Sequence, residues 1–325
     1  MKRTVSIQAV LLAALAGFAV LDSIALAQTY PSKPVRILVG FAPGGGTDIM
    51  ARVVGAKLAD ALKQQFIVDN RPGANANLAA KIAAEAPGDG YTILFMSVAH
   101  IMSKPVYKNL GYDIERDLAP ITVVSSVPNV LCVHPSLPAR SVKDLIALAK
   151  AKPGELTYAT SGVGSPEHFA GEMFKMMTKT NLLAIPYKGG GPIAIDLVAG
   201  HVISSFNTMP PIIPHIRANR VRALAVTTEK RASVLPDVPT VGETVPGYVM
   251  STWYGAVAPV KTPREIVQRL NQEIVKTLAL ADVKEKLANL GADVVGSTTE
   301  ETAAIFKNDL AKFTKVAHAA NIRAD

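Results

Sequence analysis

The sequence contains very little cysteine and few aromatic residues. Its 325 residues include one cysteine, Cys132, so an internal disulfide is impossible, and aromatic residues account for only 6%. Cys132 lies in the apolar run 130–133, where a free cysteine is typical of a small buried side chain. A chain of this length can bury a hydrophobic core without cross-links. We therefore expect a fold that does not depend on disulfides.

Several function classes lack the residue patterns that they need. No metal site and no cofactor are predicted, because the histidines show no ligand spacing and no carboxylate cluster accompanies them. These histidines are His100, His134, His168, His201, His215 and His318. A paired constellation for acid–base catalysis is also missing. The net charge of +8 comes from scattered lysines and arginines, which disfavours nucleic acid but mildly favours anionic ligands.

The longest apolar run lies at the N-terminus. Lys2 and Arg3 precede a run at 9–20, and Ala25-Leu26-Ala27 places small residues before Gln28. The run is shorter than the roughly 20 residues of a membrane-spanning helix, which disfavours an anchor. We predict a signal peptide at residues 1–27, cleaved near Ala27–Gln28, and a periplasmic mature protein.

From residue 34 onward, short β-rich runs alternate with helical patterns. Strands are expected at 35–41, 66–68, 91–96, 121–133, 156–159, 183–187, 202–206, 222–227 and 252–257. Helices are expected at 47–64, 77–86, 142–150, 167–178, 193–199, 212–218, 264–280, 281–290 and 299–319. This alternation predicts an α/β fold with a mostly parallel sheet.

Two strands, 121–133 and 252–257, are candidates for crossovers between two lobes. Lobe 1 would then comprise residues 28–125 and 253–325, and lobe 2 would comprise residues 126–252. The only tryptophan, Trp253, would lie at the hinge, where core packing is its expected role.

The first motif with chemical meaning is the glycine-rich loop FAPGGGTD at 41–48. It follows a strand and precedes a helix, so its backbone N–H groups would face outward at a helix N-terminus, where an anion is favoured. An ordinary tight turn capped by Thr47 or Asp48 is an equal alternative. The loop lacks the Gly-Lys-Ser/Thr ending of a phosphate-binding P-loop, and its glycines do not follow the spacing of a dinucleotide-binding motif.

A second loop, TSGVGSPEH at 160–168, repeats this arrangement. Ser161 and Ser165 add hydroxyl donors, and the order of residues does not match a nucleophilic-serine motif. His168 either contacts a ligand or holds the loop by a hydrogen bond. The run PYKGGGP at 186–192 adds Tyr187 and Lys188 as candidate contacts, although an exposed lysine at a strand end is common.

These motifs resemble, as a set, the Bug-type (Bordetella uptake gene family) solute receptors of tripartite tricarboxylate transporters. The resemblance also includes RPGANAN at 71–77, PGDGYTIL at 87–94, LPDVPTVGE at 235–243 and WYGAVAP at 253–259. Four features depart from the usual family pattern: the run 73–77 has fewer glycines, Phe41 replaces a common Tyr, Asn207 replaces a frequent Asp, and Ile195 replaces a smaller polar residue.

The resemblance implies a type II periplasmic-binding-protein fold, with two α/β lobes joined by crossover strands in a Venus-flytrap arrangement. It also implies that both glycine-rich loops grip one carboxylate. The contacts implied or proposed are Phe41, Pro43, Gly44, Gly45, Gly46, Thr47, Asp48, Ser97, Ala99, His100, Ser161, Gly162, Gly164, Ser165, His168, Tyr187, Lys188 and Asn207.

The predicted function is that of a monomeric, non-enzymatic receptor. It would bind an amino, dicarboxylic, tricarboxylic or aromatic acid and deliver it to integral-membrane permease subunits. Two alternatives remain open: a receptor that reports to a membrane kinase, and a secreted hydrolase that uses Ser165 and His168.

Overall fold

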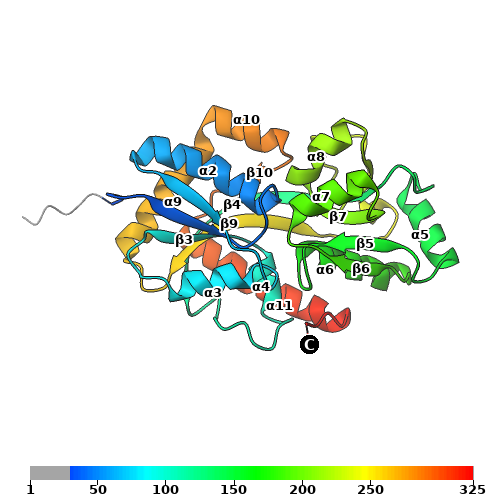
Figure 1. The fold of residues 1–325 in the computed structure, drawn as a ribbon, viewed down its shortest axis with the longest axis horizontal. Coiled ribbons are helices and arrows are strands. Elements are labelled where there is room, and N and C mark those ends of the chain that lie inside the picture. The colour runs from blue at the N-terminus through cyan, green and yellow to red at the C-terminus, as the bar shows by residue number, and fades with distance from the viewer. Residues whose placement is uncertain (1–29, 325) are drawn as a thin grey trace, which may run out of the picture.

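The computed structural model describes residues 30–324, so the predicted signal peptide lies outside the described part of the chain. The chain forms two α/β lobes that share one sheet (Figure 1). The strands are β1 (Val35–Val39), β2 (Phe66–Asn70), β3 (Thr92–Ser97), β4 (Leu118–Val133), β5 (Thr157–Thr160), β6 (Leu183–Pro186), β7 (Ser204–Thr208), β8 (Arg222–Val226), β9 (Ser251–Pro259) and β10 (Asp293–Val294).

Helices cover both faces of this sheet. They are α2 (Gly46–Leu62), α3 (Asn77–Glu85), α4 (Ala99–Ser103), α5 (Val142–Ala151), α6 (Pro166–Thr178), α7 (Gly190–Ala199), α8 (Met209–Arg217), α9 (Arg264–Ala279), α10 (Ala281–Asn289) and α11 (Thr299–Ala319). A short 3-10 turn, η1 (Val241–Glu243), lies in the long loop before β9. The short elements α4 and β10 were not expected from the sequence.

The first lobe is a layered sandwich whose strands run in the order β2-β1-β3-β9-β4. Alternate residues of β1 point to opposite faces, as in any strand. Ile37 packs with α2 and α9, whereas Leu38 packs with the alanines of α3. Because both faces are covered, every residue of β1 except the half-buried Arg36 is apolar and buried.

The second lobe is built around β7, β5 and β6, with β8 beside β4. Helices α7 and α8 pack with Val130 and Cys132 of β4 on one face, and α6 packs against the other. Cys132 is fully buried, as the sequence predicted.

Two long strands join the lobes. The first part of β4 pairs with β9, and its last residues pair with β7 and β8. All of these pairings are antiparallel, whereas β1, β2 and β3, like β5, β6 and β7, pair in parallel. The prediction of a mostly parallel sheet is therefore wrong: the sheet is mixed, because the crossover strands occupy its centre. The predicted lobe boundaries at 125/126 and 252/253 fall inside β4 and β9 and stay a prediction.

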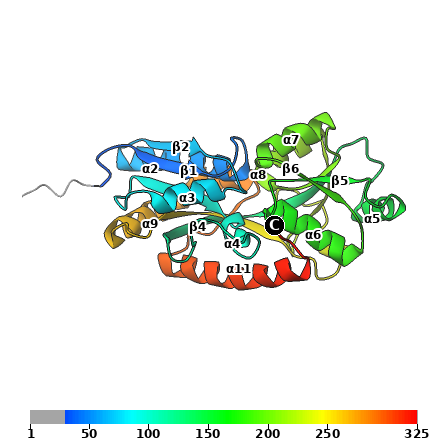
Figure 2. The ribbon, with the colours of Figure 1, turned by 60° about the horizontal axis from the view of Figure 1, so that its bottom comes forward.

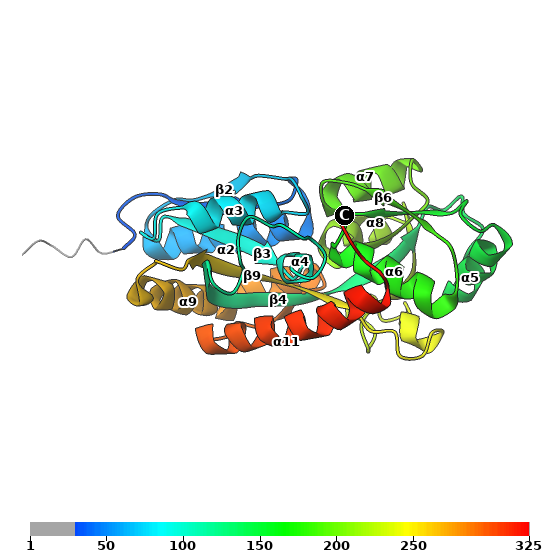
Figure 3. The same cartoon turned by 90° about the horizontal axis from the view of Figure 1, so that it is seen from below.

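The last helix, α11, lies along the molecule beneath both lobes (Figures 2 and 3). Phe306 stacks on Trp253 of the crossover strand, with ring centroids 5.3 Å apart. Further along α11, Phe313 meets Phe169 of α6 in an edge-to-face contact. Trp253 also donates a hydrogen bond of 2.6 Å from Nε1 to Asp309 Oδ2. The helix therefore ties the crossover region to the second lobe. In residues 30–324, no helix combines the length and apolar character needed to cross a membrane.

Candidate functional site between two glycine-rich loops

The loop between β1 and α2 presents an uncapped helix N-terminus. Gly45 is the N-cap residue, and no side chain caps the helix. The N–H groups of the first turn have no partner inside a helix, so those of Gly46 and Thr47 are available as donors. Gly46 fits only as glycine, because an added Cβ would lie 1.9 Å from the Tyr254 hydroxyl. Both residues are buried against the crossover strand β9.

Asp48 stabilises this loop from behind. Its carboxylate accepts hydrogen bonds from the Gly44 N–H, at 3.0 Å, and from Asn70 Nδ2, at 3.0 Å. Arg52 adds an ion pair at 2.9 Å. Burial alone would raise the pKa of the Asp48 carboxyl, but the hydrogen bonds from Arg52, Gly44 and Asn70 hold it below its usual value. Asp48 is therefore an ionised residue with its own cationic partner.

The loop between β5 and α6 uses its donors internally. Ser165 caps the helix and accepts a hydrogen bond of 3.2 Å from the His168 N–H, and Pro166 has no N–H to offer. His168 Nδ1 accepts from the Gly164 N–H at 3.3 Å. Burial lowers the pKa of His168, so the imidazole is neutral at pH 7. Glu167, in the first turn, is only 3% exposed.

The two lobes touch at the mouth of these loops, so the structure is a closed form. The Ala42 N–H donates to the Lys188 carbonyl oxygen across the cleft, at 2.9 Å. Cβ atoms added at Gly191 and Gly45 would lie 2.7 Å from the Pro43 carbonyl oxygen and 3.5 Å from the Gly190 nitrogen, respectively. Glycines thus permit close approach of the two backbones.

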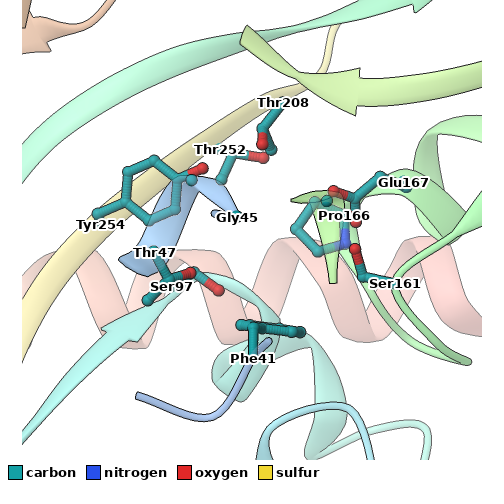
Figure 4. A pocket seen from close by; sticks show the side chains of 12 residues that line it. Phe41, Gly45, Thr47, Ser97, Ser161, Pro166, Glu167, Thr208, Thr252 and Tyr254 are labelled. Carbon is teal, nitrogen blue, oxygen red and sulfur yellow. The ribbon is translucent and has the colours of Figure 1, made fainter. Parts of the chain in front are cut away.

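Closure leaves a small polar cavity between the loops (Figure 4). Its volume is about 20 Å³, which is room for one or two waters or the oxygens of one carboxylate. Its walls come from both lobes and from the crossover strands; they are Phe41, Gly45, Gly46, Thr47, Ser97, Ser161, Pro166, Glu167, Gly190, Thr208, Thr252 and Tyr254. Figure 4 shows Glu167, Pro166 and Ser161 on one side, opposite Tyr254, Thr47 and Ser97.

A second hollow of about 240 Å³ shares Phe41 and Ser161 with this cavity. It is bordered by Tyr187 and Lys188 and by the segment 73–76. Ala74, Asn75 and Ala76 all have positive φ, between 46° and 70°, although none is glycine. Such backbone costs about 1 kcal/mol or more per residue and is held by surrounding contacts. Here Asn75 Nδ2 donates to Ser103 Oγ at 3.2 Å, and its buried Oδ1 has no partner among the described residues.

Nine of the eighteen predicted contacts line one of the two hollows or both. The inner cavity includes Phe41, Gly45, Gly46, Thr47, Ser97 and Ser161, and the outer hollow adds Gly162, Tyr187 and Lys188 to Phe41 and Ser161. The others lie behind these walls; they are Pro43, Gly44, Asp48, Ala99, His100, Gly164, Ser165, His168 and Asn207.

Three of the residues behind the walls hold them in place. His100 is fully buried, and burial lowers its pKa to about 4; its neutral Nδ1 lies 3.1 Å from the Ser97 carbonyl oxygen. Asn207 Nδ2 donates to the Gly190 carbonyl oxygen at 3.1 Å. Asp48 binds the Gly44 N–H, as described above.

Six lining residues were not predicted as contacts: Pro166, Glu167, Gly190, Thr208, Thr252 and Tyr254. The motif WYGAVAP drew attention to the strand that carries Tyr254, but no local pattern shows which of its faces meets the cleft. Glu167 belongs to the motif TSGVGSPEH, but an acidic residue in the first turn is a common feature of helices and does not by itself indicate a ligand contact. Its burial depends on the opposite lobe.

The arrangement is that of a binding site for a small polar ligand. Two lobes close over a cavity rich in N–H and hydroxyl donors, and no metal-binding cluster of histidine, cysteine or carboxylate groups occurs among residues 30–324. Such a fold and cleft define the class of periplasmic binding proteins.

Comparison with known proteins identifies the family. The chain belongs to the tripartite tricarboxylate transporter family receptors, whose pattern matches residues 50–322. Among solved structures, Rpa4515 of R. palustris with adipate is 38% identical, with a TM-score of 0.88 over 90% of this chain and 99% of that chain. The periplasmic binding protein BugD is 31% identical, with a TM-score of 0.88 over 90% and 99%.

MatC from Rhodopseudomonas palustris with bound malate is 28% identical, with a TM-score of 0.85 over 88% of this chain and 99% of that chain. The resemblance to Bug-type receptors and the predicted two-lobed binding-protein fold are thereby confirmed. The family consists of receptors, which supports the prediction of a solute-binding protein over that of a hydrolase.

Proposed function

We propose that this protein is a periplasmic receptor that captures a small dicarboxylate and presents it to the membrane subunits of a tripartite tricarboxylate-type transporter. The observation that carries the proposal is the uncapped N-terminus of α2 in the closed cavity. One carboxylate of the ligand would accept hydrogen bonds from the N–H groups of Gly46 and Thr47, where the helix dipole also favours an anion.

The outer hollow supports a second polar end on the ligand. Lys188 and Asn75 border that space, and Phe41 lines both it and the inner cavity. Rpa4515 and MatC are described with adipate and malate, which are both dicarboxylates. A periplasmic location is supported by the signal-peptide pattern at residues 1–27 and by the likeness to the periplasmic BugD.

A binding screen tests the ligand class. Thermal melting and isothermal titration calorimetry would use adipate and L-malate, with glucose as a neutral control and putrescine as a cationic one. An acid present at about 100 times its Kd adds about 2.7 kcal/mol to the free energy of unfolding. A melting shift with glucose or putrescine and none with any acid would overturn the proposal.

Two glycine variants test whether binding requires the closed form. Gly191→Ala places a methyl group 2.7 Å from the Pro43 carbonyl oxygen only when the lobes meet, so acid affinity should fall at least about tenfold while the ligand-free melting temperature changes little. Gly45→Ala is the matched control: its new contacts across the cleft, 3.5 Å and longer, are ordinary ones, and affinity should stay within about threefold. Equal affinities in both variants would contradict closure over the ligand.

A further inference from the structure

Glu167 places a carboxyl group in the cavity that is proposed to receive an anion. The residue is 3% exposed, and Figure 4 shows its carboxyl end directed toward the cavity from the wall formed by Pro166 and Ser161. Its own N–H and the hydroxyls of Ser161 and Ser165 hydrogen-bond to the carboxyl group. Oε2 nevertheless has no partner among the described residues. The second loop thus holds one carboxyl oxygen and leaves the other free.

No positive charge compensates this group. Within residues 30–324, Asp48 has Arg52 as its partner, but Glu167 forms no ion pair. The titratable groups near it are Tyr254 on β9 and, on its own helix, His168 and Glu172. Tyr254 is uncharged, because burial raises its pKa. His168 is neutral because burial lowers its pKa.

An ionised Glu167 would be unfavourable in this setting for two reasons. Burial raises the pKa of its carboxyl even though its own N–H, Ser161 and Ser165 lower it. A ligand carboxylate in the same small cavity adds a like charge, and two carboxylates that share a site cannot both ionise easily. A protonated carboxyl removes both costs and supplies an O–H donor.

We propose that Glu167 is a neutral carboxylic acid in the closed cleft and that its Oε2–H donates a hydrogen bond to the ligand carboxylate, so that capture of the ligand takes up one proton from solvent. The inference rests on the proposed function, because it names how the same site accepts a carboxylate. Without the ligand, the pKa of Glu167 would lie above that of the unfolded chain but low enough for the group to be largely ionised at neutral pH, and the like charge of the bound ligand would raise it further and protonate the group. Receptor loading is then favoured by mild acid and weakened by alkali.

The test is calorimetric titration with adipate and with L-malate at pH 6.5 and pH 8.5, each in two buffers of different ionisation enthalpy. Both acids are ionised in this range, and burial moves the pKa of His168 down and that of Tyr254 up, away from the range of the titration. The wild type should take up as much as one proton per ligand, and its affinity should fall at least about tenfold from pH 6.5 to pH 8.5.

Glu167→Gln keeps the shape and an N–H donor but cannot titrate. It should still bind the acid measurably at pH 6.5, because the amide N–H replaces the lost O–H donor, and it should lose both the pH slope and the proton uptake. Glu167→Ala, which lacks any donor, should bind at least about tenfold more weakly at pH 6.5. An unchanged slope in Glu167→Gln would overturn the inference. Proton release on binding, with loss of binding in Glu167→Gln, would instead indicate an ionised Glu167 that pairs with a cationic ligand group.

A ligand-free comparison separates this inference from the proposed function. A folded-state pKa above that of the unfolded chain means that stability is lost as pH rises from about 4.5 toward the folded value. Glu167→Gln escapes this loss, so its melting temperature should increasingly exceed that of the wild type from pH 5 to pH 8. A constant difference would overturn neutrality of Glu167 in the cleft. If no acid binds, the proposed function fails together with the donated hydrogen bond, and the melting comparison alone still decides the charge of Glu167.

Discussion

The N-termini of α2 and α6 face each other across the cleft and use their donors in opposite ways. At α2 the N-cap is Gly45, and the single acidic group of the first turn, Asp48, binds backward to Gly44, Arg52 and Asn70. At α6 the N-cap is Ser165, and Glu167 lies in the cavity. Similar strand–glycine–helix sequences therefore produce one end with free N–H donors and one end occupied by its own carboxyl group.

Because of this difference, the two loops have different roles in ligand binding. From sequence they looked like equivalent halves of one carboxylate clamp. In the structure, the first-turn donors of α6 are used by Ser165 and Glu167, so of these two helices α2 is the one that presents unpartnered N–H groups to a ligand. A variant at each loop should therefore have a distinct effect.

The largest expected effect is at Gly46. In Gly46→Ala the new Cβ would lie 1.9 Å from the hydroxyl of Tyr254, which is fully buried and cannot move aside. We expect a loss of about 3 kcal/mol in the free energy of unfolding and no detectable acid binding. Urea unfolding and calorimetry measure the two effects. Gly45→Ala is the neighbouring control, and equal stabilities of the two variants would contradict the close packing of α2 against β9.

The next largest effect on stability is expected from the ionised carboxylate of Asp48, which holds the loop between β1 and α2. Asp48→Asn should cost about 2 kcal/mol at pH 7, because the carboxylate accepts hydrogen bonds from Arg52, Gly44 and Asn70. The pKa of Asp48 is lowered in the folded state, so this stabilisation is present above the unfolded pKa of about 4 and is lost as pH falls through the folded value. Urea unfolding at pH 7 and pH 3 should show the difference shrinking in acid. A difference of the same size at both pH values would mean that the charge of Asp48 is irrelevant.

The pH response of Asp48→Asn and that of Glu167→Gln should have opposite signs. The first variant is destabilised most at neutral pH, whereas the second gains most relative to the wild type as pH rises. Measuring both on one pH series therefore tests directly whether one loop keeps an ionised carboxylate and the other keeps a neutral one.

The smallest effect is at the α6 cap. Ser165→Ala removes the acceptor for the His168 N–H and should cost about 1 kcal/mol. Ser165→Gly makes this helix start like α2, whose cap is glycine, and should cost about half as much. Chemical unfolding resolves the pair. If glycine is no better tolerated than alanine, the hydroxyl acts mainly through Glu167 rather than as a cap.

Much of the fold could be predicted from local patterns. The sequence placed α11 at 299–319, and the structure has it at Thr299–Ala319, starting with a capping box from Thr298 and Glu301. The crossover strands were also located, because long apolar runs bounded by turn residues are visible in one segment. The short helix α4 and the two-residue strand β10 were missed, since segments of two to five residues carry too little periodicity.

The site could be predicted only in part, because some of its residues lie in local loop motifs and others are brought together by strand pairing. Phe41, Gly45, Gly46, Thr47, Ser97 and Ser161 line the cavity and belong to recognisable loops. Thr208, Thr252 and Tyr254 also line it, but they lie on β7 and β9, and their meeting depends on how these strands pair with β4. Strand register between distant segments is a tertiary property, so no local pattern identifies these three residues.

The sequence alone determined the class of fold, the candidate loops and their helix starts, because a few consecutive glycine, serine and proline residues restrict backbone conformation locally. The tertiary structure decided which loop keeps free donors and which holds a carboxyl group. The electrostatic environment of Glu167 arises only when the lobes close and remove water from it. The residues that cover it are distant in sequence: Gly46 is more than 100 residues away and Tyr254 more than 80. Burial, and with it the charge state of a carboxyl group, is a property of packing rather than of local sequence.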